Sequence, residues 1–144
     1  MRRGLLTIAA LGLGGVVGTV ILGQALVGTT VGVDEAVTLQ DTLRAAYAVH
    51  LEPEPPLKVL RVPGSEEWAG WRWKIEATLK RASDPAAPAV SRALDRLAQR
   101  ALETRVQGRA PSGVMLDLRR GEDAPRRILY DRTGRRLPAP GAPK

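Results

Sequence analysis

The 144-residue chain has no cysteine, no phenylalanine and one histidine, and it has only two tyrosines and three tryptophans. The absence of cysteine excludes disulfides, thiol nucleophiles, thiolate metal sites and the lipid attachment of lipoproteins. A single histidine excludes metal sites with several histidine ligands and catalytic relays of two histidines. That residue, His50, stands between a helical pattern and a proline-rich segment, where we expect its ring to interact with helix-end carbonyls. We therefore expect no metal and no cofactor.

Sequence patterns of catalysis are equally scarce. None of the four serines stands in a nucleophile-elbow pattern, and no phosphate-binding glycine loop follows a strand pattern. Asp117 and Asp131 would form an acid pair if they faced each other on paired strands. The alternative is that they are surface carboxylates that pair with nearby arginines, which is the ordinary arrangement for exposed charges. We favour this alternative and expect that the protein is not an enzyme.

Charged residues are also absent from positions 4–33, directly after Arg2 and Arg3. Within this stretch, the 23 residues at positions 5–27 include one strongly polar residue, Gln24. As a helix, this run would span about 34 Å, which exceeds the roughly 30 Å thickness of the hydrocarbon core of a bilayer. The sequence therefore predicts a single transmembrane helix near the N-terminus.

The charges on either side of this segment predict its orientation. Arg2 and Arg3 precede it, whereas Asp34, Glu35 and Asp41 follow it before the first base. Because positively charged flanks stay in the cytoplasm, we expect a cytoplasmic N-terminus and an extracytoplasmic C-terminal part, in the periplasm or outside the cell. The expected location is the inner or plasma membrane, with a single-pass topology.

The length of the apolar run favours a retained signal anchor over a cleaved signal peptide, whose apolar core has about 7–15 residues. Cleavage at the small-x-small site at positions 23–25 is one alternative, and it would release the downstream part. A further alternative is that the segment is neither. Ala10, Gly14 and Gly18 lie on one helix face and are candidates for helix–helix packing in the membrane, although glycine is common throughout this segment.

Composition divides the chain into three parts. They are the signal-anchor segment at positions 1–33, an extracytoplasmic domain at 34–137, and a Pro/Ala-rich tail at 138–144 that we expect to be disordered. All fifteen acidic residues and twenty of the twenty-two basic residues follow Val33, so the domain is net basic. A basic surface outside a membrane suits an acidic protein, an anionic lipid or an anionic polymer as a partner. The alternative is that the charge serves only solubility.

Apolar periodicity predicts an α+β domain in the order helix, two strands, helix, two strands. Apolar and polar residues alternate over positions 71–79, which is typical of a strand with one buried face. Val90, Leu94, Leu97 and Ala101 have the spacing of a helix with one buried face. We expect a small antiparallel four-stranded sheet whose apolar face is covered by both helices. The predicted helices are residues 34–50 and 86–106, and the predicted strands are residues 57–62, 71–79, 114–119 and 126–131.

Two details of the helices follow from the same patterns. We expect Asp34 or Thr38 to cap the first helix, and Val37 and Leu43 to lie on its buried side. The segment 83–85 is expected to cap the second helix.

The three tryptophans cluster in one short segment. Trp71 and Trp73 share a strand face with Ile75 and Leu79, so we expect them in the core. The alternative is an exposed stacking platform for single-stranded nucleic acid. Trp68 does not fit the alternation, and we expect it to contact a membrane interface or a partner, or to cover the edge of the sheet.

Taken together, these patterns predict a membrane-anchored interaction or scaffold domain, as an accessory subunit of a cell-envelope complex. One alternative is a secreted, signal-cleaved module that binds a small ligand. Another is binding of nucleic acid or another polyanion by the basic C-terminal strands. The candidate interaction residues are Trp68, Arg72 and Lys74 near the first strand pair, and Arg119, Arg126 and Arg127 on the C-terminal strands.

Overall fold

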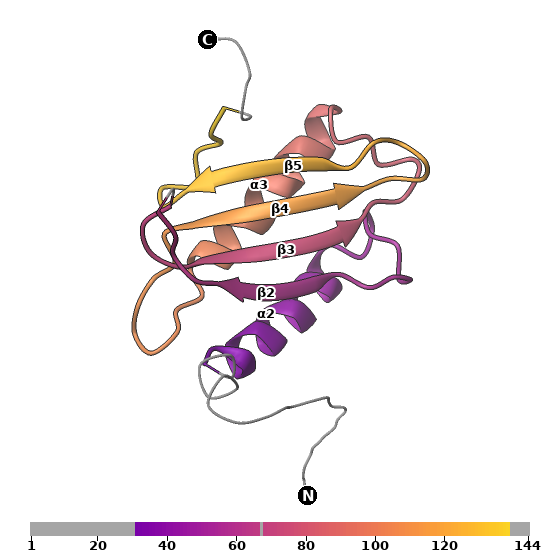
Figure 1. Cartoon of the computed structure of the whole chain (residues 1–144). Helices are drawn as coiled ribbons and strands as arrows, with labels where there is room; N and C mark the ends of the chain where they lie inside the picture. The colour runs from indigo at the N-terminus through magenta and orange to yellow at the C-terminus, as the bar shows by residue number, and fades with distance from the viewer. Residues whose placement is uncertain (1–30, 67, 139–144) are drawn as a thin grey trace, which may run out of the picture. The chain divides into compact units, whose positions relative to one another are not determined.

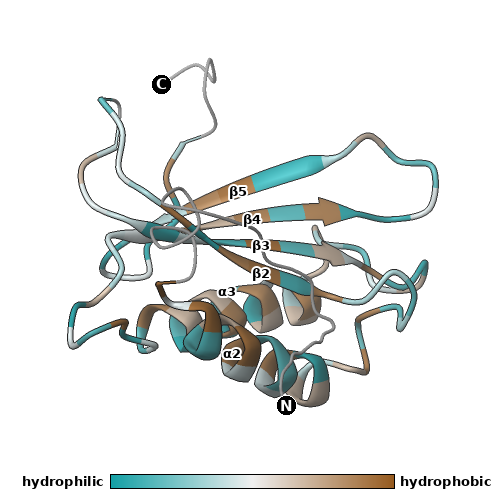
Figure 2. Cartoon of the chain, turned by 60° about the horizontal axis from the view of Figure 1, so that its bottom comes forward, coloured by the Kyte–Doolittle hydropathy of each residue, from teal (hydrophilic) through white to brown (hydrophobic). Residues whose placement is uncertain are grey.

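The computed structural model describes residues 31–66 and 68–138, in which two helices cover one face of a four-stranded sheet (Figure 1, Figure 2). The α+β class and the order of elements are as the sequence predicted. The predicted anchor at positions 5–27, with Ala10, Gly14 and Gly18, lies outside the described residues, as does most of the predicted tail. Within the described residues, neither helix has the length and apolar character needed to cross a membrane. The elements are α2 (Val33–Ala46), β2 (Lys58–Val62), β3 (Arg72–Thr78), α3 (Pro88–Leu102), β4 (Gly113–Arg119) and β5 (Arg126–Asp131).

The strands follow one another across the sheet in the order β2-β3-β4-β5. The two outer pairs are antiparallel, but β3 and β4 are parallel, so the expectation of a wholly antiparallel sheet is wrong at its centre. The reason is the length of α3. Its 15 residues extend about 22 Å, which matches the roughly 23 Å of the seven-residue strand β3. The helix therefore carries the chain back to the end where β3 began, and β4 runs alongside β3.

The core lies between the sheet and the two helices (Figure 2). Alternation along β3 gives this face its side chains, as predicted, and Trp73 is 0% exposed. Parallel register places the inward residues of β4 beside those of β3, and α3 closes over both strands with its predicted apolar stripe. The buried residues include Trp73, Ile75 and Ala77 of β3, Val114, Leu116 and Leu118 of β4, Ile128 and Tyr130 of β5, Leu39 and Leu43 of α2, and Val90, Leu94, Leu97 and Ala101 of α3.

The predicted helix caps are wrong. The N-cap residue of α2 is Gly32, whose φ of 85° is readily adopted only by glycine, and no side chain caps the helix. Asp84 accepts a hydrogen bond of 2.9 Å from Ala86 N–H, in the turn before α3, instead of capping the helix itself. Val37 precedes the buried Leu39 by two residues, which is about 200° around the helix, so it faces outward and is 49% exposed, contrary to prediction.

Both edges of the sheet are covered. On the β2 edge, the side chain of Gln40 accepts a hydrogen bond of 3.1 Å from Val59 N–H. Arg44 Nε donates to the carbonyl of Leu57 at 2.9 Å on the same edge. On the β5 edge, the chain turns back after the strand, and its backbone pairs with it. These contacts reduce the number of edge groups to which another strand can add.

A polar cluster attaches the segment after β5 to α3. The buried Tyr130 hydroxyl donates to Asp95 Oδ1 at 2.9 Å, and Arg136 Nε donates to the same oxygen at 2.7 Å. Arg136 also donates to the Ser91 hydroxyl at 2.9 Å. Burial, followed by the hydrogen bond to Asp95, raises the pKa of the Tyr130 phenol well above its usual value. The phenol therefore stays neutral, and the cluster is a structural contact.

Candidate functional site

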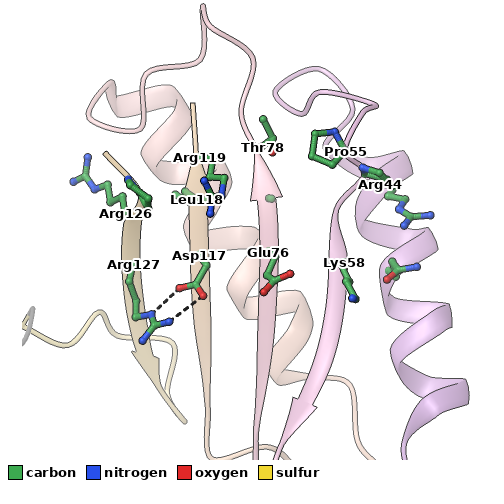
Figure 3. Close-up of a pocket in the computed structure, with 14 residues that line it drawn as sticks. Arg44, Pro55, Lys58, Glu76, Thr78, Asp117, Leu118, Arg119, Arg126 and Arg127 are labelled. Atoms are coloured by element: carbon green, nitrogen blue, oxygen red, sulfur yellow. Dashed lines mark hydrogen bonds and ion pairs between the residues drawn. The ribbon is translucent and has the colours of Figure 1, made fainter. Parts of the chain in front are cut away.

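The face of the sheet opposite the helices carries the candidate site (Figure 2, Figure 3). We call it the helix-free face. Because side chains alternate along each strand, register assigns every second residue to it. Its members are Lys58, Leu60 and Val62 of β2, Arg72, Lys74, Glu76 and Thr78 of β3, Met115, Asp117 and Arg119 of β4, and Arg127, Leu129 and Asp131 of β5.

Trp68 covers one end of this face, where β3 and β4 begin. Its indole lies against Gly113, where any side chain would collide with it. Arg72 stacks on the same indole, with its guanidinium carbon 4.9 Å from the centre of the Trp68 ring. Within the described residues, Arg72 Nε and Nη1 are buried and lack a hydrogen-bond partner. The half-buried Trp68 thus lies over the central strand β4 and not over an edge strand, which was one of its three predicted positions, and Arg72 is enclosed with it. Contact of Trp68 with a membrane or a partner stays a prediction.

The other two tryptophans lie on the helix side of the same end. Trp73 is in the core, and its Nε1 donates to the carbonyl of Thr104 at 3.1 Å. Trp71 is half-buried and packs edge-on against Trp73 with ring centres 5.0 Å apart. The guanidinium carbon of Arg61 lies 5.3 Å from the centre of the Trp71 ring. We call this part of the molecule the tryptophan end.

The middle of the helix-free face is a row of charges across all four strands (Figure 3). Lys58, Glu76, Asp117 and Arg127 stand opposite one another in successive strands. Arg127 donates two hydrogen bonds to Asp117, at 2.7 and 3.1 Å, and these raise the pKa of its guanidinium. Lys74 Nζ lies 3.4 Å from Glu76 and 3.9 Å from Asp117. Lys74 and Arg127 are therefore already paired with carboxylates of the domain.

Asp117 and Asp131 do not face each other, so the acid pair considered in the sequence analysis does not form. Asp117 stands opposite Arg127, whereas Asp131 stands opposite Gly113 at the tryptophan end. Asp131 instead accepts hydrogen bonds from Thr133, whose hydroxyl contributes most to lowering the pKa of the carboxyl. Asp117 thus pairs with an arginine, as the alternative interpretation stated, whereas Asp131 binds Thr133 and the backbone and has no ion pair among the described residues.

An open groove occupies the other end of the helix-free face, where β3 and β4 finish. Its volume is about 940 Å³, and its lining includes five cationic side chains and two carboxylates. Pro55 and Pro56 form part of its wall, beside Arg44 of α2 (Figure 3). We call this the arginine groove, and the end of the sheet that carries it the arginine end. Its charged members are Arg44, Lys58, Glu76, Asp117, Arg119, Arg126 and Arg127.

Arg119 and Arg126 also line a second, smaller pocket of about 150 Å³. Both carboxylates around this pocket form ion pairs with Arg120. Its Nη1 lies 3.5 Å from Asp84 Oδ1, and its Nε lies 3.0 Å from Asp123 Oδ2. Among residues 31–66 and 68–138, neither Arg119 nor Arg126 pairs with a carboxylate. These two exposed arginines therefore carry uncompensated charge where the two hollows meet.

His50 lies away from this groove. Its Nδ1 is 3.0 Å from the hydroxyl of Ser83, so the ring binds a serine side chain and not the helix-end carbonyls that we expected. Ser83 is only 5% exposed, which leaves its hydroxyl little access to a substrate. No cluster of three or more metal-ligating residues occurs in the described part of the chain.

The structure divides the predicted interaction residues into three groups. Trp68 and Arg72 lie together at the tryptophan end, Lys74 lies in the middle, and Arg119, Arg126 and Arg127 gather at the arginine groove. Sequence reasoning missed Lys58, Arg44 and the proline wall. The strand at 57–62 is apolar on both faces, so its pattern did not show which way Lys58 points.

A comparison of the chain with protein-family models, curated proteins and solved structures found no match.

Proposed function

We propose that this protein is a membrane-anchored, extracytoplasmic interaction domain, and that it serves as an accessory or scaffold subunit of a cell-envelope complex. It acts by binding and not by catalysis. The observation that carries this proposal is the arginine groove. Both helices pack on one face of the sheet, and a hollow of about 940 Å³ lies at one end of the opposite face. Two carboxylates and three cations of that face line it, together with Arg44 of α2 and with Arg126, which register places on the helix side of β5.

Charge supports an acidic partner. The cations in the middle of the helix-free face are paired with Glu76 and Asp117, but Arg119 and Arg126 are exposed and carry uncompensated charge. Exposed charges of one sign increase the rate at which an oppositely charged partner associates, and they select against partners of the same charge. An acidic envelope protein fits this surface.

The proposed anchor rests on the apolar run at positions 5–27, preceded by Arg2 and Arg3. The chain enters the described domain at Gly32, which packs against Arg61 and Val106 at the tryptophan end. Within the domain, the arginine groove lies at the other end of the sheet.

Site-specific photocrosslinking in intact cells tests the proposal. A benzophenone amino acid replaces Lys58 or Thr78 in the groove, or Arg92 or Arg96 on the exposed side of α3 as matched controls. We expect one adduct of the same mass from both groove positions and none from the control positions. The absence of a groove-specific adduct, or the same adduct from all four positions, would refute docking at this face.

A further inference from the structure

We propose that the arginine groove binds an extended acidic peptide segment of the partner, with carboxylates about four residues apart. This inference rests on the proposed interaction function and specifies the chemistry of the partner. It takes its support from the distribution of charge within the groove and from the length of the groove.

The groove has two ends with positive charge that is unpaired among the described residues, and a middle whose carboxylates are ion-paired. Arg119 and Arg126 lie at the end formed by β4 and β5, and Lys58 lies at the end formed by β2. Between them lie Glu76 and Asp117, on the two central strands. A ligand that complements this pattern places a carboxylate at each end and a neutral stretch over the middle.

The width of the sheet fixes the spacing of those carboxylates. The groove spans β5 to β2, which is three inter-strand spacings of about 4.8 Å, or about 14 Å. An extended peptide advances about 3.3 Å per residue and directs every second side chain to the same side. Acidic residues at positions i and i+4 are therefore about 13 Å apart and share one side, which matches the two positive ends.

A uniform polyanion suits the groove less well. Nucleic acid carries a phosphate at every step, so some phosphates would lie over the ion pairs that Glu76 and Asp117 make with Lys74 and Arg127, where the cations are already paired. The spaced carboxylates of a peptide contact only the two positive ends. The ion-paired middle of the groove thus selects for a ligand with alternating charged and neutral parts.

Titration of the isotopically labelled full-length protein in detergent micelles, followed by NMR, tests this inference. The probes are the capped synthetic peptides Glu-Thr-Val-Thr-Glu and Gln-Thr-Val-Thr-Gln, a thymidine oligonucleotide, and phosphatidylglycerol vesicles. We expect the glutamate peptide to shift the amide signals of Lys58, Thr78 and Arg119, and the glutamine peptide to bind far more weakly.

Two double variants provide the matched comparison. Arg119→Ala with Arg126→Ala should weaken binding of the glutamate peptide roughly fivefold to thirtyfold, because two exposed ion pairs are lost. Arg132→Ala with Arg135→Ala removes the same charge from exposed positions beyond the other end of β5. This variant should change the affinity for the glutamate peptide less than twofold. Circular dichroism confirms that both variants keep the fold.

Several results would overturn the inference. Equal weakening in the two double variants would show that net charge alone attracts the peptide, and equal binding of both peptides would show that the carboxylates are not recognised. Preferential binding of the oligonucleotide or the vesicles, lost in the Arg119 and Arg126 variant, would assign the groove to a different occupant. If groove-specific crosslinks form in cells while the peptide fails to bind, the acidic segment is refuted and the docking function stands. If the crosslinks also fail, the proposed function falls as well.

Discussion

At the tryptophan end of the sheet, the guanidinium of Arg72 lies 4.9 Å from the ring centre of Trp68, whereas Arg119 at the arginine end is exposed and has no carboxylate partner among the described residues. The two residues lie on the same face of adjacent strands. Their surroundings differ because the connection before β3 folds Trp68 over Gly113 at one end, and no aromatic side chain lines the groove at the other.

The surroundings of the guanidinium determine what Arg72 and Arg119 can do, whereas Lys74 and Arg127 on the same face are already paired with carboxylates. A guanidinium that stacks on an indole gains cation–π attraction, but its enclosed nitrogens lose water and thus have little to offer a partner. A guanidinium that remains in water keeps its donors for a carboxylate from outside. Arg72 is enclosed in the first way, whereas Arg119 remains in water in the second way, as does Arg126, which register places on the helix side of β5.

The comparison predicts that the tryptophan end holds most of the stability of the domain. Trp73→Ala should reduce the free energy of unfolding by about 3–5 kcal/mol, because it removes a fully buried indole and its hydrogen bond to Thr104. Trp71→Ala, two residues away and only half-buried, should cost clearly less. Urea unfolding followed by circular dichroism measures both. Equal effects of the two substitutions would contradict the placement of Trp73 at the centre of the core.

A smaller effect should follow from a change beneath the Trp68 cover. In Gly113→Ala, the new methyl group would collide with the Trp68 ring and the carbonyl of Tyr130. We expect a loss of about 1–3 kcal/mol in the free energy of unfolding and a red shift of tryptophan fluorescence, as the indole moves into water. Unchanged fluorescence would contradict the covering position of Trp68.

The double variant Gly113→Ala with Trp68→Ala refines this measurement. The part of the cost that disappears when Trp68 is already absent is the coupling between the two residues. A coupling near zero would mean that the cost of Gly113→Ala comes from the backbone of Tyr130 and not from the Trp68 ring.

How much of the fold the sequence predicts depends on the kind of signal. The alternation around Trp73 and Ile75 predicted a strand with one buried face, and the spacing of Val90, Leu94 and Leu97 predicted the helix that covers it. The direction of β4 relative to β3 was not predictable in this way, because parallel and antiparallel strands alternate alike. Only the length of α3, which a pattern locates to within a few residues, distinguishes the two arrangements.

The candidate site was predicted less completely, since it depends on strand register. Arg126 and Arg127 are adjacent in the sequence and appeared equivalent. Register places Arg127 opposite Asp117, which binds it, and leaves Arg126 without a carboxylate partner among the described residues. Trp68 does not fit the strand alternation, so nothing in the sequence indicated that it folds back under Arg72. Contacts between strands decide which charges stay exposed, and a single sequence does not specify them.

The smallest effect on stability is expected at the arginine end. Arg119→Ala with Arg126→Ala should change the free energy of unfolding by no more than about 0.5 kcal/mol per site, because both side chains are exposed and the described residues provide them with no ion pair. Urea unfolding of this variant beside Arg72→Ala makes the comparison direct. Arg72→Ala removes a stacked guanidinium and should lower the free energy of unfolding by about 1 kcal/mol or more. If the double variant were the more destabilised of the two, Arg119 and Arg126 would be part of the fold, and their charge would no longer argue for a partner.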